Sequence, residues 1–214
     1  MPQANKEIIR TGRKFDQVLR GARDVFLADG FSGASVDDIA RAAGVSKATL
    51  YSYFPDKRLL FMEVAKTECQ RQAEEAVELT DYDAPPRELM TLAARKMIEI
   101  LTSEFSQRIF RICVAESDRF PELGQAFYES GPMLGRSHMA EYLRCACDKG
   151  ELQIEDIDLA ADQFIELCKA DLYTKAVFGI QSQFAAAEID RIAKGAVDMF
   201  LARYGADQLC AQPS

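Results

Sequence analysis

The stretch of residues 44–57 constrains most strongly what this chain can fold into. Gly44 fits the position after a helix end, where a left-handed backbone conformation is cheap only for glycine. Ser46 can cap a new helix, and Pro55 disfavours helical geometry in the residue before it, so that helix has room for about two turns. Just upstream, Ser35 and Asp38 have the spacing of a capping box that begins another short helix. Two short helices around a tight turn predict a helix-turn-helix.

The second of these helices carries side chains suited to a DNA major groove. Hydrogen-bonding groups lie near its N-terminus, where the helix dipole also favours phosphate. The candidates for base contacts are Lys47, Thr49 and Ser52, and those for backbone contacts are Tyr51, Tyr53 and Lys57. The same pattern is also compatible with a short solvated helical pair inside an all-α domain, since helical hairpins are common.

A family resemblance separates these two interpretations. Residues 45–57, VSKATLYSYFPDK, resemble the TetR family of bacterial transcription regulators, and so do residues 39–44, IARAAG, within a similar region of roughly residues 12–60. The resemblance implies DNA-binding positions at Ser35, Ser46, Lys47, Ala48, Thr49, Tyr51, Ser52, Tyr53 and Lys57. One residue departs from the pattern, because Asp37 stands where some relatives carry a base-reading arginine. Asp37 should repel phosphate, so base reading is expected to depend on the second helix alone.

The charge distribution agrees with a nucleic-acid partner at one end of the chain. The formal net charge is −8, yet residues 1–58 carry ten Lys and Arg against seven Asp and Glu. The rest of the chain carries sixteen basic and twenty-seven acidic side chains. Basic residues cluster at the start, namely Lys6, Arg10, Arg13 and Lys14. A basic head on an acidic body favours a polyanion at the head only.

The remainder of the chain predicts helices throughout. Apolar residues at helical spacing and Gly/Pro stops indicate a helix after Lys57 and then segments at about 86–103, 106–118, 121–130, 132–149, 158–179 and 187–204. Asp158 is the expected N-cap, and Gly150 and Gly179 are expected stops. The predicted fold is all-α, with a three-helix DNA-binding head at residues 1–58 and a larger helical domain at 59–208. The chain lacks an apolar run long enough to span a bilayer and an apparent secretory signal, so a cytoplasmic protein without a membrane partner is expected.

The larger domain shows a second resemblance. Residues 110–117, 119–123, 126–128, 131–132 and 158–164 resemble the C-terminal domain of an AefR-like branch of the same family. This resemblance implies a small-molecule effector bound among the middle helices and a homodimer formed through the last two. The expected ligand-lining residues are Phe105, Phe110, Cys113, Phe127, Tyr128, Met139, Tyr142, Phe164 and Cys168. The expected dimer surface comprises Phe164, Leu167, Leu172, Tyr173, Val177, Phe178, Ile189, Ile192, Ala193, Ala196, Val197, Phe200 and Leu201.

These patterns predict a DNA-binding repressor that a small apolar or aromatic ligand releases from a palindromic operator. Two alternatives remain open. Six cysteines allow a DNA-binding redox sensor, although reduced thiols are the default for a cytoplasmic chain. An all-α enzyme or small-molecule-binding protein with a structural head is the other. His138 is the single histidine, so neither a His-based metal cluster nor a His-dependent triad can be assembled, and no catalytic residue, metal or cofactor is expected.

Overall fold

The structure, a computed structural model, describes residues 12–77 and 84–206. These residues form α-helices joined by turns, and the described residues contain no β-strand, only an isolated antiparallel bridge between Leu152 and Gly205. The all-α prediction is therefore confirmed. The chain divides into two compact units, one formed by residues 1–69 and 108–127 and the other by residues 70–107 and 128–214. The predicted head, residues 1–58, falls within the first unit, and the predicted second domain contributes to both.

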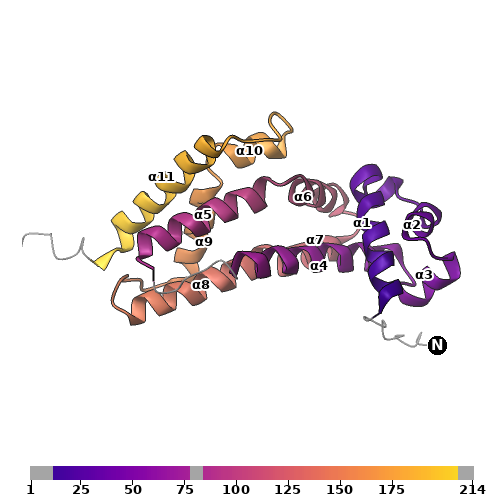
Figure 1. The fold of residues 1–214 in the computed structure, drawn as a ribbon, viewed down its shortest axis with the longest axis horizontal. Helices are drawn as coiled ribbons and strands as arrows, with labels where there is room; N and C mark the ends of the chain where they lie inside the picture. The colour runs from indigo at the N-terminus through magenta and orange to yellow at the C-terminus, as the bar shows by residue number, and fades with distance from the viewer. Residues whose placement is uncertain (1–11, 78–83, 207–214) are drawn as a thin grey trace, which may run out of the picture. The chain divides into compact units, whose positions relative to one another are not determined.

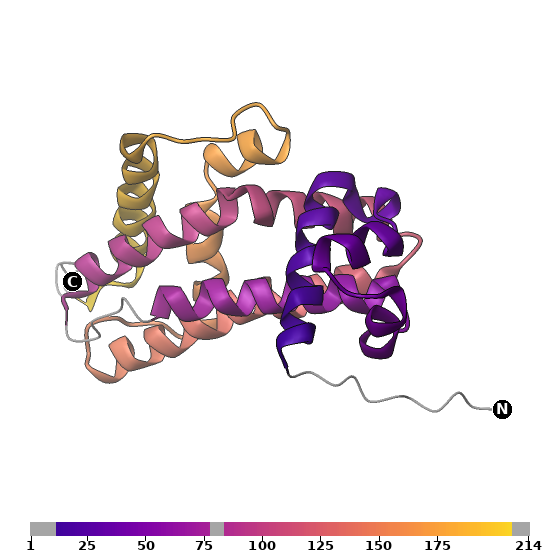
Figure 2. The ribbon, with the colours of Figure 1, turned by 45° about the vertical axis from the view of Figure 1, so that its right-hand side comes forward.

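The first unit contains α1 (Arg13–Gly33), α2 (Val36–Ala43) and α3 (Lys47–Tyr53), which lie together in Figure 2. It also contains the start of α4 (Lys57–Val77), the end of α6 (Glu104–Glu116) and most of α7 (Pro121–Ser130) (Figure 1). The apolar residues that close the head are all buried: Phe15, Leu19, Phe26, Phe31, Ile39, Leu50 and Phe54. Phe61 adds to this core from α4, with its ring centroid 5.1 Å from that of Phe26 and 5.4 Å from that of Phe31.

A glycine sets the distance between α1 and α2. A Cβ atom on Gly21 would lie 2.5 Å from the backbone nitrogen of Ala43 and 2.7 Å from its Cα. Both distances are shorter than van der Waals contact, so the two helices touch backbone to backbone at this point. Any larger residue at position 21 has to push α2 away from α1.

The second unit contains α5 (Pro86–Thr102), α8 (Pro132–Asp148), α9 (Ile157–Cys168), α10 (Leu172–Val177) and α11 (Ala186–Tyr204). In this unit α5 packs against α11, and α8 packs against α9 (Figure 1). Ion pairs connect α5 to α11, one between Arg87 and Asp198 and another between Arg95 and Asp190 at 2.7 Å. The packed faces bury Met90, Ile98, Leu143, Phe164 and Phe200, among others, in one apolar core.

The segment predicted as one helix at 158–179 forms two helices, α9 and α10. The break comes at Asp171, a non-glycine residue with a φ of 62°, which a continuous α-helix cannot accommodate. The N-cap is Asp156 rather than Asp158, because the Asp156 carboxylate accepts a hydrogen bond from the Leu159 amide at 2.9 Å. The predicted stops at Gly150 and Gly179 are confirmed by φ angles of 75° and 68°.

Seven residues of the predicted dimer surface are buried inside the second unit, so their assignment to an exposed surface is wrong: Phe164, Leu172, Ile192, Ala193, Ala196, Val197 and Phe200. They pack α9 and α11 onto the rest of that unit, and amphipathic spacing cannot distinguish this packing from packing on a partner. Large apolar side chains that do face outward in the described part of α9 to α11 are Leu159, Phe178, Ile180 and Met199. None of the helices in the described parts of the chain has the length and apolarity that a bilayer span requires.

Candidate nucleic-acid interface

The helix-turn-helix has the caps that its sequence predicts. Ser35 begins α2 by accepting a hydrogen bond from the Asp38 amide at 3.1 Å. Gly44 ends α2 in the left-handed conformation, with φ 63° and ψ 33°, and its amide donates to the Arg41 carbonyl at 3.1 Å. Ser46 then begins α3 by accepting a hydrogen bond from the Thr49 amide at 3.0 Å. The turn between the two helices is therefore closed by local hydrogen bonds.

One face of α3 is buried and the opposite face is open to solvent. Leu50 is 1% exposed and anchors α3 in the core of the first unit. The exposed residues of the predicted DNA-binding set are Ser46, Lys47, Ala48, Tyr51 and Ser52. The spacing of Lys47, Ala48, Tyr51 and Ser52 places them on one side of a helix.

Several polar groups predicted to contact DNA also make bonds within the protein. The hydroxyl oxygens of Ser46 and Thr49 lie 2.8 Å apart, and the Ser52 hydroxyl donates to the Thr49 carbonyl at 2.6 Å. Half-buried Tyr53 packs its ring edge-on against Phe15, with centroids 5.9 Å apart. These contacts stabilise α3, and the same residues border its exposed face.

Lys47 is ion-paired with Asp37 from the first turn of α2. Its Nζ lies 3.0 Å from Asp37 Oδ1 and 3.1 Å from Oδ2. The hydrogen bond to Asp37 raises the pKa of the Lys47 ammonium, so this group is charged at neutral pH. On the same surface Arg41 pairs with Asp38 at 2.7 Å. Each of these two cations therefore has a carboxylate partner.

Lys57, predicted to hold phosphate, braces the end of α1. Its Nζ donates to the carbonyl oxygens of Phe31 at 2.7 Å and Ala34 at 3.0 Å, and it lies 4.6 Å from the centre of the Phe31 ring. Burial lowers the pKa of this ammonium below its ordinary value.

Of the basic cluster at the chain start, Arg13 and Lys14 are exposed at the beginning of α1, whereas Lys6 and Arg10 lie outside the described residues.

We therefore expect Lys57→Met to lower the free energy of unfolding by about 1–3 kcal/mol, because two carbonyl acceptors lose their charged donor. Urea denaturation measures the change, and Lys66→Met on the same helix is the control for loss of one positive charge. If both variants unfold at the same urea concentration, the two hydrogen bonds contribute nothing to stability. In its predicted phosphate role, the loss of Lys57 should also reduce the salt slope of DNA binding by about one.

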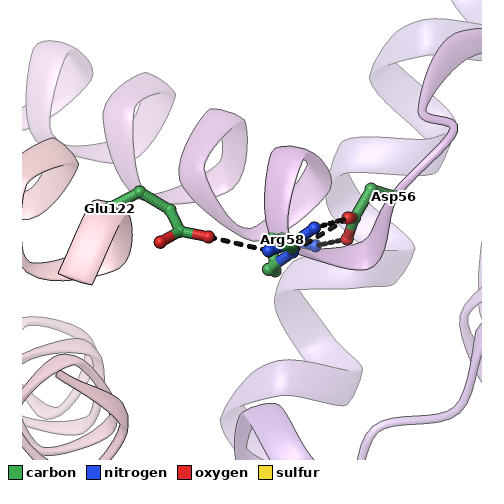
Figure 3. A network of polar contacts seen from close by, with 3 residues as sticks. All are labelled: Asp56, Arg58 and Glu122. Carbon is green, nitrogen blue, oxygen red and sulfur yellow. Dashed lines mark hydrogen bonds and ion pairs between the residues drawn. The ribbon is translucent and has the colours of Figure 1, made fainter. Parts of the chain in front are cut away.

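The sequence gives no indication of a polar network that joins the start of α4 to α7 within the first unit (Figure 3). Arg58 lies between two carboxylates: its backbone amide and Nε each donate to Asp56 at 2.8 Å, and its Nη1 donates to Glu122 Oε1 at 2.9 Å. The Arg58 guanidinium also lies 5.4 Å from the centre of the Phe120 ring, which meets Phe31 edge-on at 5.6 Å. Arg58 and Glu122 are 64 residues apart, so no local pattern predicts the pairing.

A surface hollow of about 340 Å³ lies beside this network. It is lined by Phe31, Ser32, Asp56, Lys57, Arg58, Arg119 and Phe120. Two of the three basic side chains around it face carboxylates: Arg58 bonds Asp56 and Glu122, and the charge of Glu116 acts on Lys57. The hollow is therefore close to electrically balanced, and it does not coincide with the predicted ligand-lining residues.

The predicted ligand-lining residues fall into both units. Phe110, Cys113 and Phe127 belong to the first, where the rings of Phe110 and Phe127 have centroids 6.0 Å apart. The others belong to the second: Phe105, Tyr128, Met139, Tyr142, Phe164 and Cys168. Tyr128 is half exposed, whereas Met139, Tyr142, Phe164 and Cys168 belong to the buried core of their unit.

Tyr142 has a buried hydroxyl that finds no hydrogen-bond partner among the described residues. Burial raises the pKa of this phenol to about 12, so it is neutral and can donate. A buried hydroxyl without a partner is costly, because it loses its hydrogen bonds to water and gains none in the protein.

The cysteines give no support to a redox sensor. Cys113 and Cys168 are buried, and burial raises the pKa of each thiol to about 12, which suppresses the reactive thiolate. Cys145 is exposed, Cys69 and Cys147 are half buried, and Cys210 lies outside the described residues. No group of three or more His, Cys, Asp and Glu side chains suited to a metal occurs in the described part of the chain.

Two short capped helices with an open polar face on α3, built into an all-α chain, define the class of helix-turn-helix DNA-binding regulators. The family follows from the whole chain. Residues 18–64 match the family model described as bacterial regulatory proteins, tetR family, and residues 88–206 match the AefR-like transcriptional repressor C-terminal domain. The chain belongs to the TetR family, as its sequence motifs predict.

Relatives and solved structures agree with this assignment. The HTH-type transcriptional repressor AcnR of Corynebacterium efficiens is 36% identical over 58 residues, which cover 27% of this chain and 31% of AcnR. The chain thus spans about a third of the length of AcnR. The HTH-type transcriptional regulator UidR of Escherichia coli K12 is 25% identical over 151 residues, covering 67% of this chain and 71% of UidR.

Two solved structures are similar over nearly the whole chain. A TetR-family transcriptional regulator from Mesorhizobium loti has a TM-score of 0.84 and 29% identity, covering 95% of this chain and 100% of its own. The flavonoid-responsive regulator FrrA has a TM-score of 0.77 and 35% identity, covering 91% of this chain and 98% of its own.

Proposed function

We propose that this protein is a transcriptional repressor that binds a palindromic operator as a homodimer and is released by a small aromatic or apolar effector. The observation that carries the DNA-binding part is the open face of α3, held by the caps at Ser35, Gly44 and Ser46. In this proposal Lys47, Ala48, Thr49 and Ser52 face base edges, and Ser35, Tyr51, Tyr53 and Lys57 face phosphates.

The experiment is a selection of DNA duplexes from a random-sequence library, followed by affinity measurements at increasing salt. A repressor of this kind selects a palindrome and keeps discriminating against random duplexes as salt rises. Enrichment of no sequence at any salt concentration would overturn the proposal.

The homodimer rests on the outward apolar side chains of α11 and of the segment after α10. Phe178 is 75% exposed, Ile180 74% and Met199 64%, and exposed apolar groups that gather in one patch are typical of an interaction site. Met199 stands one turn from Gly195, where a Cβ atom would meet nothing within 4 Å, so another helix can approach closely here. Two copies of α11 with the preceding segment would make a four-helix interface.

The effector proposal rests on Tyr142 and on the likeness to FrrA. FrrA is a flavonoid-responsive regulator, and flavonoids are flat aromatic molecules with hydroxyl and carbonyl groups. The buried Tyr142 hydroxyl can donate to one such oxygen, while Met139 and Phe164 supply apolar surface in the same unit. We propose that an aromatic effector with a polar substituent binds next to Tyr142.

Effector and operator would act on each other through α4, which is one uninterrupted helix from Lys57 to Val77 and contributes to both units. In this proposal the effector tilts α4 and changes the spacing of the two recognition helices in the dimer. Linkage then requires that the effector weaken operator binding by the same factor by which the operator weakens effector binding.

Tyr142→Phe is expected to leave the unliganded protein as stable as the parent or to stabilise it by up to about 1 kcal/mol, because it removes a buried hydroxyl without a partner. The same change should raise by about tenfold the effector concentration needed to release DNA. Thermal unfolding and DNA-release titrations with a panel of hydroxylated aromatic compounds provide the two readouts.

Tyr204→Phe is the matched control, because the Tyr204 hydroxyl donates to Gln163 at 2.7 Å. Its loss should destabilise the protein by about 0.5–1.5 kcal/mol and leave the effector response unchanged. An unchanged effector response in Tyr142→Phe would remove Tyr142 from the proposed site.

A further inference from the structure

The ion pair between Asp37 and Lys47 is out of place on a surface that only has to attract DNA. The side chains of Asp37 and Lys47 are 65% and 50% exposed, so neither charge is needed to compensate a buried charge. A carboxylate on the DNA-facing side repels phosphate and neutralises the one Lys or Arg of α3. The pair therefore lowers general DNA affinity, which is useful only if it improves the choice of sequence.

The geometry of the pair matches a base pair that presents an acceptor beside a donor in the major groove. A lysine ammonium only donates hydrogen bonds and an ionised carboxylate only accepts them. Lys47 Nζ lies 3.0 Å from Asp37 Oδ1, so the pair presents a donor and an acceptor one hydrogen-bond length apart. Across a G·C pair, guanine O6 accepts and cytosine N4 donates, and these two atoms are also one hydrogen-bond length apart.

Two of the other three base pairs fit this arrangement worse. In the same register an A·T pair presents the adenine N6 donor to the ammonium and the thymine O4 acceptor to the carboxylate. The ammonium then faces a donor and the carboxylate faces an acceptor, so neither hydrogen bond can form. A C·G pair in reversed orientation has the same two mismatches. A T·A pair presents thymine O4 to the ammonium and adenine N6 to the carboxylate, so it fits as well as G·C.

We propose that Asp37 and Lys47 act as one reader of a single base pair in each half of the operator, selecting G·C or T·A over C·G or A·T. Lys47 donates to guanine O6 or thymine O4, and Asp37 accepts from cytosine N4 or adenine N6. Asp37 of α2 is then a specificity-determining residue, in contrast to the expectation that α3 reads alone. The inference rests on the proposed function, in which α3 enters the major groove.

The test is a random-duplex selection with the full chain as parent, Asp37→Ala, Lys47→Ala and the double variant. Asp37→Ala should lose preference for G·C and T·A over C·G and A·T at one position of each half-site, by between about fivefold and about 150-fold. Its binding to random DNA should become stronger, with a salt slope steeper by about one, because Lys47 is then free to contact phosphate. If the pair acts as a unit, the double variant should lose no more preference at that position than Lys47→Ala does.

Asp24→Ala is the control, since it removes the same charge from an exposed side chain of α1 in the same unit. It should leave the base preference of the parent unchanged. The proposed pair is overturned if the parent selects a palindrome and Asp37→Ala selects it with the same preference at every position. If the parent selects no sequence, the proposed function fails, and the pair fails with it.

Discussion

Replacing Gly21 with alanine is expected to lower the free energy of unfolding by about 1–3 kcal/mol and to weaken operator binding in the molecules that remain folded. The added Cβ would sit 2.5 Å from the backbone nitrogen of Ala43, and a backbone atom cannot rotate away as a side chain can. The α2 helix must move away from α1, and the α2–α3 turn moves with it. Urea denaturation and operator titration measure the two effects.

The matched control is Gly124→Ala on α7 of the same unit, where a new Cβ would meet nothing within 4 Å. Helix propensity alone should make this variant more stable by about 0.5–1 kcal/mol. The same propensity acts at Gly21, so opposite signs in the two variants would isolate the contact with α2. A Gly21→Ala protein as stable as the parent would show that the two helices do not meet in this way.

Met199→Glu is expected to convert the protein into a monomer and to reduce operator affinity by about 100-fold or more, because each head then binds its half-site without the help of the other. A carboxylate cannot be buried in an apolar interface without a large desolvation cost. Since Met199 is 64% exposed in the single chain, the protomer itself should stay folded. Light scattering gives the mass, and circular dichroism reports whether the helices persist.

Met133→Glu on α8 is the control, because Met133 is an exposed methionine of the same unit and undergoes the same chemical change. It should remain dimeric and bind the operator normally. A parent protein that is monomeric at micromolar concentration yet binds its operator fully would contradict the dimer proposal, as would a Met199→Glu protein that remains dimeric.

The local elements of this protein could be predicted from sequence because short-range rules determine them. Ser35, Gly44 and Ser46 form the caps that their positions predict, since capping involves residues three or four apart. The motif at residues 45–57 was sufficient to assign the family, and periodic apolar residues were sufficient for the all-α class. The same rules did not predict the helix break at Asp171, where a non-glycine residue adopts a left-handed conformation that no local pattern indicates.

Tertiary structure decided which partner each surface and each charge meets. Amphipathic spacing made Ile192, Val197 and Phe200 resemble an interface, yet they are buried in their own unit, because the pattern records an apolar face and not what covers it. Lys57 was predicted as a phosphate contact, and packing brings its Nζ to two carbonyl oxygens at the end of α1. From sequence, Asp37 was expected only to repel phosphate, but the packing of α2 and α3 places it in an ion pair with Lys47. Gly21 has no distinguishing feature in the sequence, and only the packing of α2 shows that a side chain does not fit there. Sequence determines which groups a helix offers, but contacts between residues far apart in the chain depend on packing in three dimensions, which no local spacing encodes.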